Sequence, residues 1–496
     1  MPSLNLTLKP ELKSTLPVRV LQFGEGNFLR GFIDWMVFKC NEKGLFNGRI
    51  LALQPTPKGR VVPKLLKQDC LYTTILHGMV DGHPTEYREV VNAIAGALNP
   101  YSEEWLKILD AACAEELQFV FSNTTEAGIA YVREEIEGTT APSSFPAKLT
   151  ALLLKRFRHY GDKASAHGLI IMPCELIDDN GTKLKEIVLR HIADHNLGED
   201  FKAYVEQDCR FLNTLVDRVV SGYPTANEAH YKELLGYDDE LMTSGEIFGF
   251  MAIEGGKDLE DLLPFAKAGL NVVIDEDISK YRLRKVRLLN GGHTANVPAA
   301  YLAGFDTVDE MMSDPVTRRF FNHVVFEEII PALDLDPEML TSFANDVAAR
   351  FSDKDMHHQL ASILMNCTSK LKARVLSSLL DARAKGQKPR GLCFSVAAYL
   401  ALYMNATGVP VKVGRANGVE GEFRDDEAAV AILVDAFKGF DASDTASVEK
   451  TVRAALSATA LWDQDLTGDE FIVSEVCTAL TSIARVGVID AMPAYF

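Results

Sequence analysis

The sequence of 496 residues lacks a paired-cysteine motif, a long apolar run and a signal-peptide pattern. Its eight cysteines are scattered without a Cys-x-x-Cys pair, unlike a disulfide framework or a zinc site, so we expect small buried side chains in a reducing compartment. No apolar run approaches the roughly 20 residues that span a bilayer, and the amino-terminal segment has no basic-then-apolar pattern. These absences predict a cytoplasmic protein with no metal site and no membrane partner.

Positive charge is also scarce, since 51 basic residues face 69 acidic ones and the formal net charge is −18. Such a field repels nucleic acid and anionic membrane surfaces, so an anionic ligand needs a local basic pocket. The composition, 47% hydrophobic and 24% charged, is typical of a soluble globular protein. Because one hydrophobic core stops growing near roughly 250 to 300 residues, we expect two domains.

No internal repeat or flexible linker marks the boundary between these domains, so we place it where the hydrophobic periodicity changes. In the first part, short β-prone runs alternate with helix-like stretches, which predicts a parallel, doubly wound sheet of the Rossmann type. Past about residue 280 the apolar spacing is mainly helical. We therefore predict a dinucleotide-binding domain over residues 1–280 and a mainly helical substrate domain over residues 281–496. The expected strands are 18–23, 50–54, 117–122 and 169–172, and the expected helices are 28–41, 146–160, 322–333, 356–380 and 427–437.

A glycine-containing turn follows the first expected strand, where Gly24, Gly26 and Asn27 precede a helix. Glycines there let backbone N–H groups approach a pyrophosphate at a positive helix end. The common fingerprint has a third glycine where this chain has Leu29, so a purely structural turn is an equal alternative.

The end of the second expected strand carries no acidic residue to bind the ribose, because the chain there reads Gln54-Pro55-Thr56. The charges in this segment therefore do not indicate whether NAD or NADP binds. Lys58 and Arg60 lie just beyond and either meet a 2′-phosphate or, as we favour, are solvated loop charges.

The densest concentration of reactive groups is Lys285, Asn290 and His293, within KVRLLNGGH. If this segment is helical, the three side chains can converge on one pocket. Reduction of a ketone needs a proton donor near the oxygen and a neutral group that hydrogen-bonds it. From spacing alone, a surface lysine and an asparagine that caps a helix are strong alternatives.

Several segments, in this order, resemble the mannitol dehydrogenase family of polyol-specific long-chain dehydrogenases. The resemblance runs from about residue 17 to the carboxy terminus. Within the family, the chain is most similar to members that interconvert D-tagaturonate and D-altronate. The segments are GEGNFLRGF, VFSNTTEAG, CELIDDNGTKLKEIVLRHI, FLNTLVDRVV, KVRLLNGGH, HHQL and SKLKAR.

This resemblance implies a Rossmann-type domain, a helical second domain, a metal-independent mechanism and NAD as cofactor. It assigns Lys285 as general acid/base, Asn290 as hydrogen-bond donor to the reacting oxygen, and His293 and Lys370 as substrate contacts. The expected cofactor contacts are Gly24, Gly26, Asn27, Phe28, Gln54, Asn123 and Thr124.

Two departures from the family pattern concern the substrate pocket. Where mannitol dehydrogenases have an asparagine that helps hold the oxyanion, this chain has Leu176, which cannot donate a hydrogen bond. Either Asn290 works alone, or another donor replaces that asparagine. Ser362 stands near where they have an arginine, which argues against a neutral polyol as natural substrate.

The uronate end of a sugar acid requires cations. Lys370 and Arg374 are four residues apart and can share a helix face, and His358 lies twelve residues before Lys370. Arginine binds a carboxylate as a fork with lysine as a point charge beside it, so these side chains are our candidate clamp. An exposed basic helix face is the alternative.

We therefore expect a reductase of tagaturonate. The alternatives are fructuronate and mannonate, mannitol and fructose, or a non-catalytic nicotinamide-binding regulator. The oligomeric state is left open.

Overall fold

The computed structural model describes residues 1–80 and 82–496. The chain forms two compact units, of which the first ends at Ile278 and the second runs from Ser279 to Phe496. Among the described residues, no helix combines the length and the apolar character that crossing a membrane requires.

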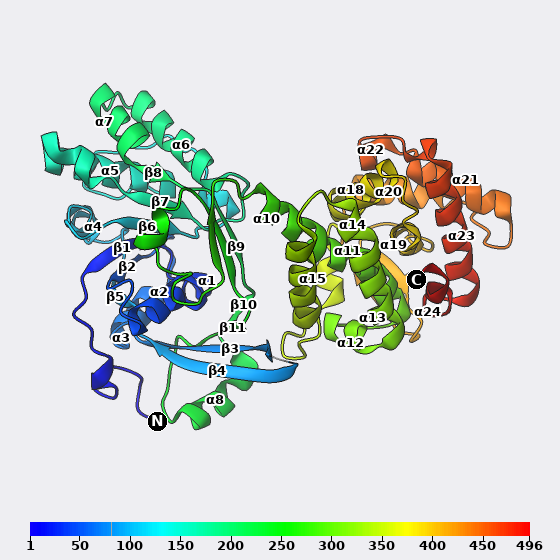
Figure 1. Ribbon diagram of the computed structural model, residues 1–496, viewed down its shortest axis with the longest axis horizontal. Coiled ribbons are helices and arrows are strands. Elements are labelled where there is room, and N and C mark those ends of the chain that lie inside the picture. Colours follow the sequence, from blue (N-terminus) through cyan, green and yellow to red (C-terminus); the bar gives the residue numbers. More distant parts are fainter. Residues whose placement is uncertain (81) are drawn as a thin grey trace. The chain divides into compact units, whose positions relative to one another are not determined.

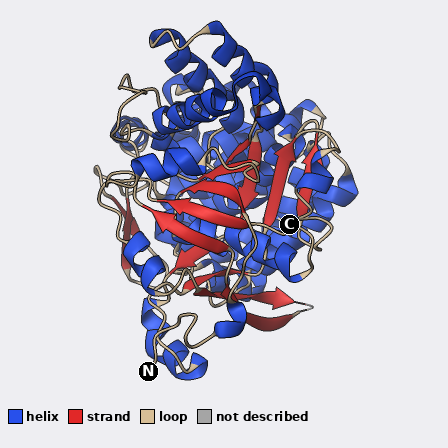
Figure 2. Ribbon diagram, turned by 90° about the vertical axis from the view of Figure 1, so that its left-hand side faces the viewer, coloured by secondary structure: helices blue, strands red, loops and turns tan. Residues whose placement is uncertain are grey.

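The N-terminal unit is built on a six-stranded parallel sheet in the order β5-β2-β1-β6-β7-β8. Numbered within the sheet, this order is 3-2-1-4-5-6, that of a Rossmann fold, and the direction of winding reverses between β1 and β6. This confirms the predicted parallel, doubly wound sheet. Figure 2 shows its strands, in red, lying between helices. The strands and helices are β1 (Val18–Phe23), α1 (Asn27–Gly31), α2 (Ile33–Glu42), β2 (Arg49–Leu53), α3 (Val61–Lys67), β5 (Ile94–Leu98), α4 (Trp105–Ala111), β6 (Phe119–Ser122), α5 (Phe145–Tyr160), β7 (Ile170–Pro173), α6 (Asn180–Asp194), α7 (Glu199–Ala203) and β8 (Arg210–Phe211).

Both faces of this sheet are buried, because successive side chains of a strand point to opposite faces and each face has its own core. In β6, Phe119 and Phe121 belong to the core that α1, α2 and α3 cover. Val120 between them belongs to the core under α4, α5 and α6. The strands therefore read as continuous apolar runs, which made them recognisable in the sequence.

Two smaller sheets complete the N-terminal unit, and the sequence did not predict them. One has the order β10-β11-β3-β4 and the other β13-β12-β9. In the first, Thr243 of β11 pairs in parallel with Thr74 of β3, so the partners come from distant parts of the chain. The additional elements are β3 (Tyr72–Val80), β4 (His83–Val91), β9 (Thr214–Asp217), β10 (Val220–Gly222), α8 (Glu228–Leu235), β11 (Thr243–Glu246), β12 (Phe250–Glu254), α9 (Leu259–Leu262) and β13 (Val272–Asp275).

The C-terminal unit is mainly helical, as predicted, and its one described sheet is the hairpin of β14 and β15. Helices α11 and α19 are buried almost all round, pack on each other and form its centre (Figure 1). The elements are α10 (Ser279–Arg284), α11 (Gly291–Ala303), α12 (Val308–Ser313), α13 (Pro315–Asn322), α14 (Ile330–Ala332), α15 (Pro337–Phe351), α16 (Leu360–Leu364), α17 (Cys367–Lys370), α18 (Ser377–Ala384), α19 (Arg390–Ala401), β14 (Val411–Gly414), β15 (Glu420–Phe423), α20 (Glu427–Ala436), α21 (Thr445–Leu456), α22 (Thr459–Trp462), α23 (Glu470–Val486) and α24 (Val488–Ala491).

Three segments of this unit are π-helical and join α-helices end to end: Lys285–Asn290, His323–Ile329 and Leu371–Leu376. The helix expected over residues 356–380 was wrong in detail. It begins only at Leu360 and is interrupted at Met365 and Asn366, where Asn366 has a left-handed backbone (φ 55°). The helix expected over residues 28–41 is likewise interrupted at Phe32.

Candidate active site

The turn between β1 and α1 has a backbone shape that depends on glycine. Gly24 has φ +126°, a conformation that side-chain-bearing residues rarely adopt. A Cβ there would lie 3.0 Å from Cδ1 of Leu29, which is buried and occupies the position of the missing third glycine. A Cβ at Gly26 would meet nothing within 4 Å, so the chain leaves open space on the outer side of the turn. Asn27 and the half-buried Phe28 begin α1.

Beneath the turn lie two buried acids that the sequence did not single out. Burial raises the pKa of Glu25 to about 7 and that of Asp34 to about 8, although Arg30 opposes both shifts. Oε2 of Glu25 and both carboxylate oxygens of Asp34 have no hydrogen-bond partner among the described residues. At neutral pH, Asp34 is therefore largely protonated, and Glu25, within the turn itself, is only about half ionised.

Asn123 and Thr124, at the end of β6, lie beside the turn, since a Cβ on Gly24 would be 3.1 Å from the carbonyl oxygen of Asn123. Their side chains are held by the residues after β7. Nδ2 of Asn123 donates to the carbonyl of Cys174 at 2.9 Å, and the amide and hydroxyl of Thr124 both donate to Oε1 of Glu175 at 2.9 Å. Glu175 thus fixes the loop at the topological switch point. Leu176, next to it, is 64% exposed.

Gln54 directly follows β2, and no acidic residue closes that strand. Its side chain is buried and donates from Nε2 to the carbonyl of Thr56 at 2.8 Å, inside its own loop. Lys58 and Arg60 of the same loop are exposed. The structure therefore brings Gly24 and Asn123 together but directs the amide of Gln54 inward.

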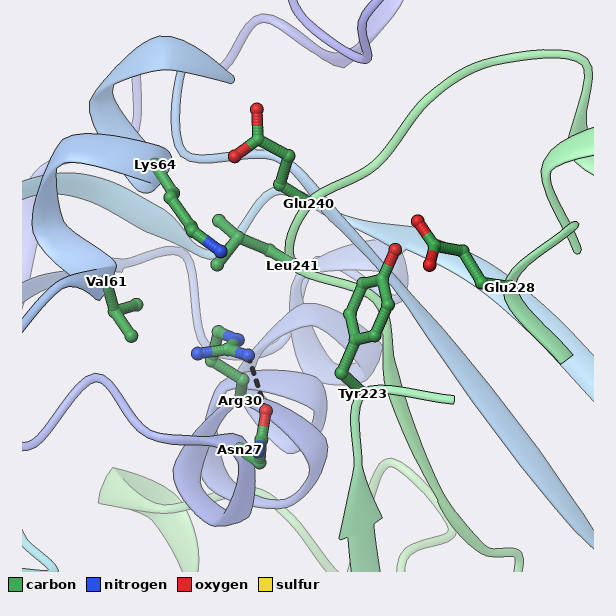
Figure 3. Close-up of a pocket in the computed structure, with 8 residues that line it drawn as sticks. All are labelled: Asn27, Arg30, Val61, Lys64, Tyr223, Glu228, Glu240 and Leu241. Carbon is green, nitrogen blue, oxygen red and sulfur yellow. Dashed lines mark hydrogen bonds between the residues drawn. The ribbon is translucent and has the colours of Figure 1, made fainter. Parts of the chain in front are cut away.

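A pocket of about 360 Å³ adjoins the turn, with Asn27 and Arg30 in its wall (Figure 3). Nη2 of Arg30 donates to Oδ1 of Asn27 at 2.7 Å, which orients the asparagine. Opposite them lie Lys64 of α3 and Leu241, and Tyr223 lies at the side. These walls come from four separate segments, so spacing along the chain gave no signal for this pocket.

Lys285 and Asn290 are the ends of the first π-helical segment. In an α-helix, residues five apart point about 140° away from each other. In a π-helix the hydrogen bond joins residues five apart, so Lys285 and Asn290 lie about one turn apart on nearly the same face. Asn290 does not cap a helix, because the chain continues into α11, which carries His293 in its first turn.

The two glycines after Asn290 allow close helix packing. A Cβ on Gly291 would lie 3.6 Å from the carbonyl oxygen of Arg374, and one on Gly292 would lie 3.2 Å from the ring of Phe321. The segment that carries Arg374 therefore packs directly against the start of α11. Nη1 of Arg374 donates to Oγ1 of Thr294 at 3.3 Å, beside His293.

His293 is surrounded by cationic side chains. Burial first, and then His358, Arg350, Arg374 and Lys370, hold the pKa of His293 well below its usual range. Burial and Lys370 lower the pKa of His358, so both imidazoles are neutral at pH 7.

Geometry supports this grouping. The ring of His293 stacks on Phe351 at 3.8 Å and meets the ring of His358 edge-on at 5.2 Å. Its Nε2 is inaccessible and has no hydrogen-bond partner among the described residues. Nζ of Lys370 donates to the carbonyl of Ile363 at 2.8 Å. The structure therefore brings together four predicted residues, His293, His358, Lys370 and Arg374, in a chain of net charge −18.

Sequence reasoning missed Arg350 and Phe351, which end α15 and lie next to His293. No motif marks them, because their helix is an ordinary amphipathic one. Within the described parts of the chain, no group of three or more His, Cys, Asp or Glu side chains is arranged to hold a metal ion. All eight cysteines are free, and six of them are buried.

Full-length relatives of this chain share a name. The altronate oxidoreductase of Halalkalibacterium halodurans is 40% identical over 484 residues, which cover 97% of this chain and 93% of that protein. The altronate oxidoreductase of Escherichia coli O9:H4 is 39% identical over 483 residues, with 96% of each chain covered.

Two solved structures share the fold. A D-sorbitol dehydrogenase in substrate-free form superposes with a TM-score of 0.78 at 20% identity, over 99% of this chain and 100% of that one. The mannitol 2-dehydrogenase of Pseudomonas fluorescens, in a ternary complex with NAD and D-mannitol, gives a TM-score of 0.67 at 20% identity, over 99% of both chains.

Family models match both units. The mannitol dehydrogenase Rossmann domain matches residues 18–264, and the mannitol dehydrogenase C-terminal domain matches residues 277–484. With relatives at about 40% identity over nearly the whole chain, the conclusion is direct: the chain belongs to the mannitol dehydrogenase family.

Proposed function

We propose that this protein is an NAD(H)-dependent oxidoreductase that interconverts D-tagaturonate and D-altronate. The full-length relatives named altronate oxidoreductase support the substrate pair. The observation that carries the proposal is the cluster of cations around His293. In a chain of net charge −18, such a cluster indicates a pocket that binds an anion.

The residues of the N-terminal unit fit a dinucleotide. The positive φ of Gly24 and the open space at Gly26 form a cradle that any side chain would fill. We propose that Gly24, Gly26, Asn27 and Phe28 bind the pyrophosphate region, and that Asn123 and Thr124 contact the cofactor at the switch point. Gln54 contributes through its backbone, since its amide is engaged with Thr56.

In the proposed reaction, a ketone, a proton and NADH give a secondary alcohol and NAD⁺. When bound, NADH supplies a hydride to the keto carbon. Lys285, as an ammonium, donates a proton to the oxygen as the C–H bond forms, and takes it back in the oxidation of altronate. Asn290, on the same face of the π-helical segment, donates a hydrogen bond to that oxygen.

Leu176 explains why Asn290 carries this hydrogen bond without a second asparagine. The leucine has no donor, and the neighbouring Glu175 accepts three hydrogen bonds from Ser122 and Thr124. Neither side chain is available as a donor to an oxyanion.

The carboxylate of the sugar acid has a separate set of contacts in this proposal. Arg374 and Lys370 bind this carboxylate, and the neutral imidazoles of His293 and His358 donate hydrogen bonds to the substrate. Nε2 of His293 is sealed from solvent in this structure, so its ring or its neighbours must move before it donates to the substrate. That hydrogen bond would remove the cost of a buried polar atom without a partner, about 1 to 3 kcal/mol. The first unit thus serves the dinucleotide and the second the substrate, in a protein that we place in the cytoplasm, where free cysteines persist.

The deciding experiment follows NADH oxidation by the purified protein with tagaturonate, fructuronate or fructose. We expect tagaturonate to give the highest kcat/KM, by at least about tenfold. A preference for fructuronate or for fructose would replace the substrate assignment. Tight NADH binding without turnover of any of the three would indicate a regulator instead.

A further inference from the structure

The helical segment that carries Lys370 and Arg374 begins without a cap of its own. Its first α-helical piece, α17, has only four residues, and Asn366 before it makes no capping hydrogen bond with its side chain. α17 continues directly into the π-helical segment Leu371–Leu376 and α18, but the first amides of any helix have no partner within the helix. Something else must hold its first turn in place.

Asp425, which follows β15, supplies that support. Its Oδ2 accepts hydrogen bonds from the amide of Thr368 at 3.0 Å and from the hydroxyl of Thr368 at 2.6 Å. The thiol of Cys367 donates to the same oxygen at 3.1 Å. Asp425 is 6% exposed, so these hydrogen bonds form away from water.

Two buried tyrosines hold this carboxylate and its threonine. The hydroxyl of Tyr403 donates to Oδ2 of Asp425 at 2.6 Å, and the hydroxyl of Tyr399 lies 2.5 Å from Oγ1 of Thr368. Burial raises the pKa of both tyrosines well above the usual range, so both hydroxyls stay protonated. Tyr399 belongs to α19, so the network ties the start of α17 to the central helix of the unit.

Lys370 is only two residues from Thr368, and Arg374 follows one turn later in the π-helical segment. Burial and Arg374 lower the pKa of Lys370, and Cys367 and Asp425 oppose that shift. The carboxylate therefore acts on the clamp in two ways, through the backbone of the helix and through its charge.

We propose that Asp425, with Tyr403 and Thr368, is a positioning residue that holds the segment of Lys370 and Arg374 in place for the carboxylate of the substrate. This inference rests on the proposed function, which makes those two cations the uronate clamp. Asp425 itself touches neither the substrate nor the cofactor in this proposal.

The test uses Asp425→Asn and Tyr403→Phe in the full-length enzyme. Loss of one such hydrogen bond costs about 0.5 to 1.5 kcal/mol, so Tyr403→Phe should raise KM for tagaturonate by about two- to tenfold, with kcat within about twofold and KM for NADH unchanged. Asp425→Asn should have a larger effect in the same direction. If that variant does not fold, Tyr403→Phe decides alone.

Glu328→Gln is the matched control, because Glu328 is another buried carboxylate of this unit and accepts from the amides of Gly391 and Leu392 at 2.7 Å. It should lower the melting temperature without raising KM for tagaturonate. An equal rise in KM in this control, or unchanged KM in Tyr403→Phe, overturns the inference.

Hydrogen exchange separates this inference from the proposed function, since it needs no substrate. Peptides covering residues 366–376 should exchange faster in Tyr403→Phe than in the wild type or in Glu328→Gln. Unchanged exchange in that segment contradicts the positioning role. A wild type that fails to reduce tagaturonate contradicts the proposed function instead.

Discussion

The ligand sites proposed for the two units are built from different parts of the chain. At the turn after β1, the N-terminal unit offers backbone, and the pKa values of its two buried acids there are raised by burial. Around His293, the C-terminal unit offers charged side chains from two helical segments. A backbone site depends on the absence of side chains, whereas a side-chain site depends on particular ones. Substitutions should therefore act on cofactor affinity in the first unit and on turnover or substrate affinity in the second.

The substitution Lys285→Ala removes the proposed acid/base and should have the largest effect of those that test this comparison. We expect kcat to fall by at least about a hundredfold, the range for loss of general acid catalysis, with NADH affinity near that of the wild type. Stopped-flow turnover and fluorescence titration with NADH measure the two quantities. A residual rate within about fivefold of the wild type would remove Lys285 from the mechanism.

Arg374→Met tests the carboxylate clamp, because methionine keeps much of the volume and removes the fork. The apparent affinity for tagaturonate should fall by about 2 to 3 kcal/mol, which is roughly 30- to 150-fold, and activity on a neutral ketose should fall much less. Lys372→Met is the matched control, since the ammonium of Lys372 in the same segment pairs with Asp463 at 3.0 Å. Equal losses on charged and neutral substrates would show that Arg374 supports the fold instead.

For the backbone site, Gly26→Val places a side chain in the open space of the turn. KM for NADH should rise by about tenfold or more, with a smaller change in kcat. Gly408→Val, at another glycine with nothing within 4 Å of a Cβ, should leave KM for NADH unchanged. Unaltered cofactor affinity in a folded Gly26→Val protein would move the dinucleotide away from this turn.

Features that depend on neighbouring residues in the sequence could be predicted, and features that depend on contacts between distant segments could not. The limits of β1 and the turn after it were predicted correctly, because an apolar run, two glycines and a helix are all local signals. The extra sheets were missed because β3 pairs with β11 across long stretches of chain. Lys285 and Asn290 were predicted, but the π-helical turn that aligns them leaves no mark in hydrophobic spacing.

The residues around His293 also show that contacts between distant segments are hard to predict from the sequence. Lys370 and Arg374 were predicted from their spacing and from the resemblance, whereas Arg350 and Asp425 come from segments with no recognisable pattern. A buried charge network is visible only once the fold brings its members together.

The last prediction concerns Asp34, and its effect is measured in the stability of the fold rather than in the rate of the reaction. Burial raises the pKa of Asp34 to about 8, so the folded chain binds a proton that the unfolded chain has released above its ordinary pKa near 4. This contribution to stability is fully present below about pH 4 and is lost as the pH rises toward 8. The melting temperature of Asp34→Asn should therefore fall less between pH 5 and pH 8 than that of the wild type. Parallel curves for the two proteins would contradict the raised pKa.

The π-helical segment that joins α10 to α11 also determines how this region tolerates changes in length. A π turn holds one residue more than an α turn, so the segment is equivalent to an insertion within an otherwise ordinary helix. Deleting one residue there would restore a regular α-helix, in which Lys285 and Asn290 would be four residues apart and would still share a face. Winding all the present residues as a regular α-helix, without a deletion, would instead point Lys285 and Asn290 about 140° apart. The π turn therefore lets a five-residue spacing place two side chains on one face, which a regular α-helix achieves with a four-residue spacing.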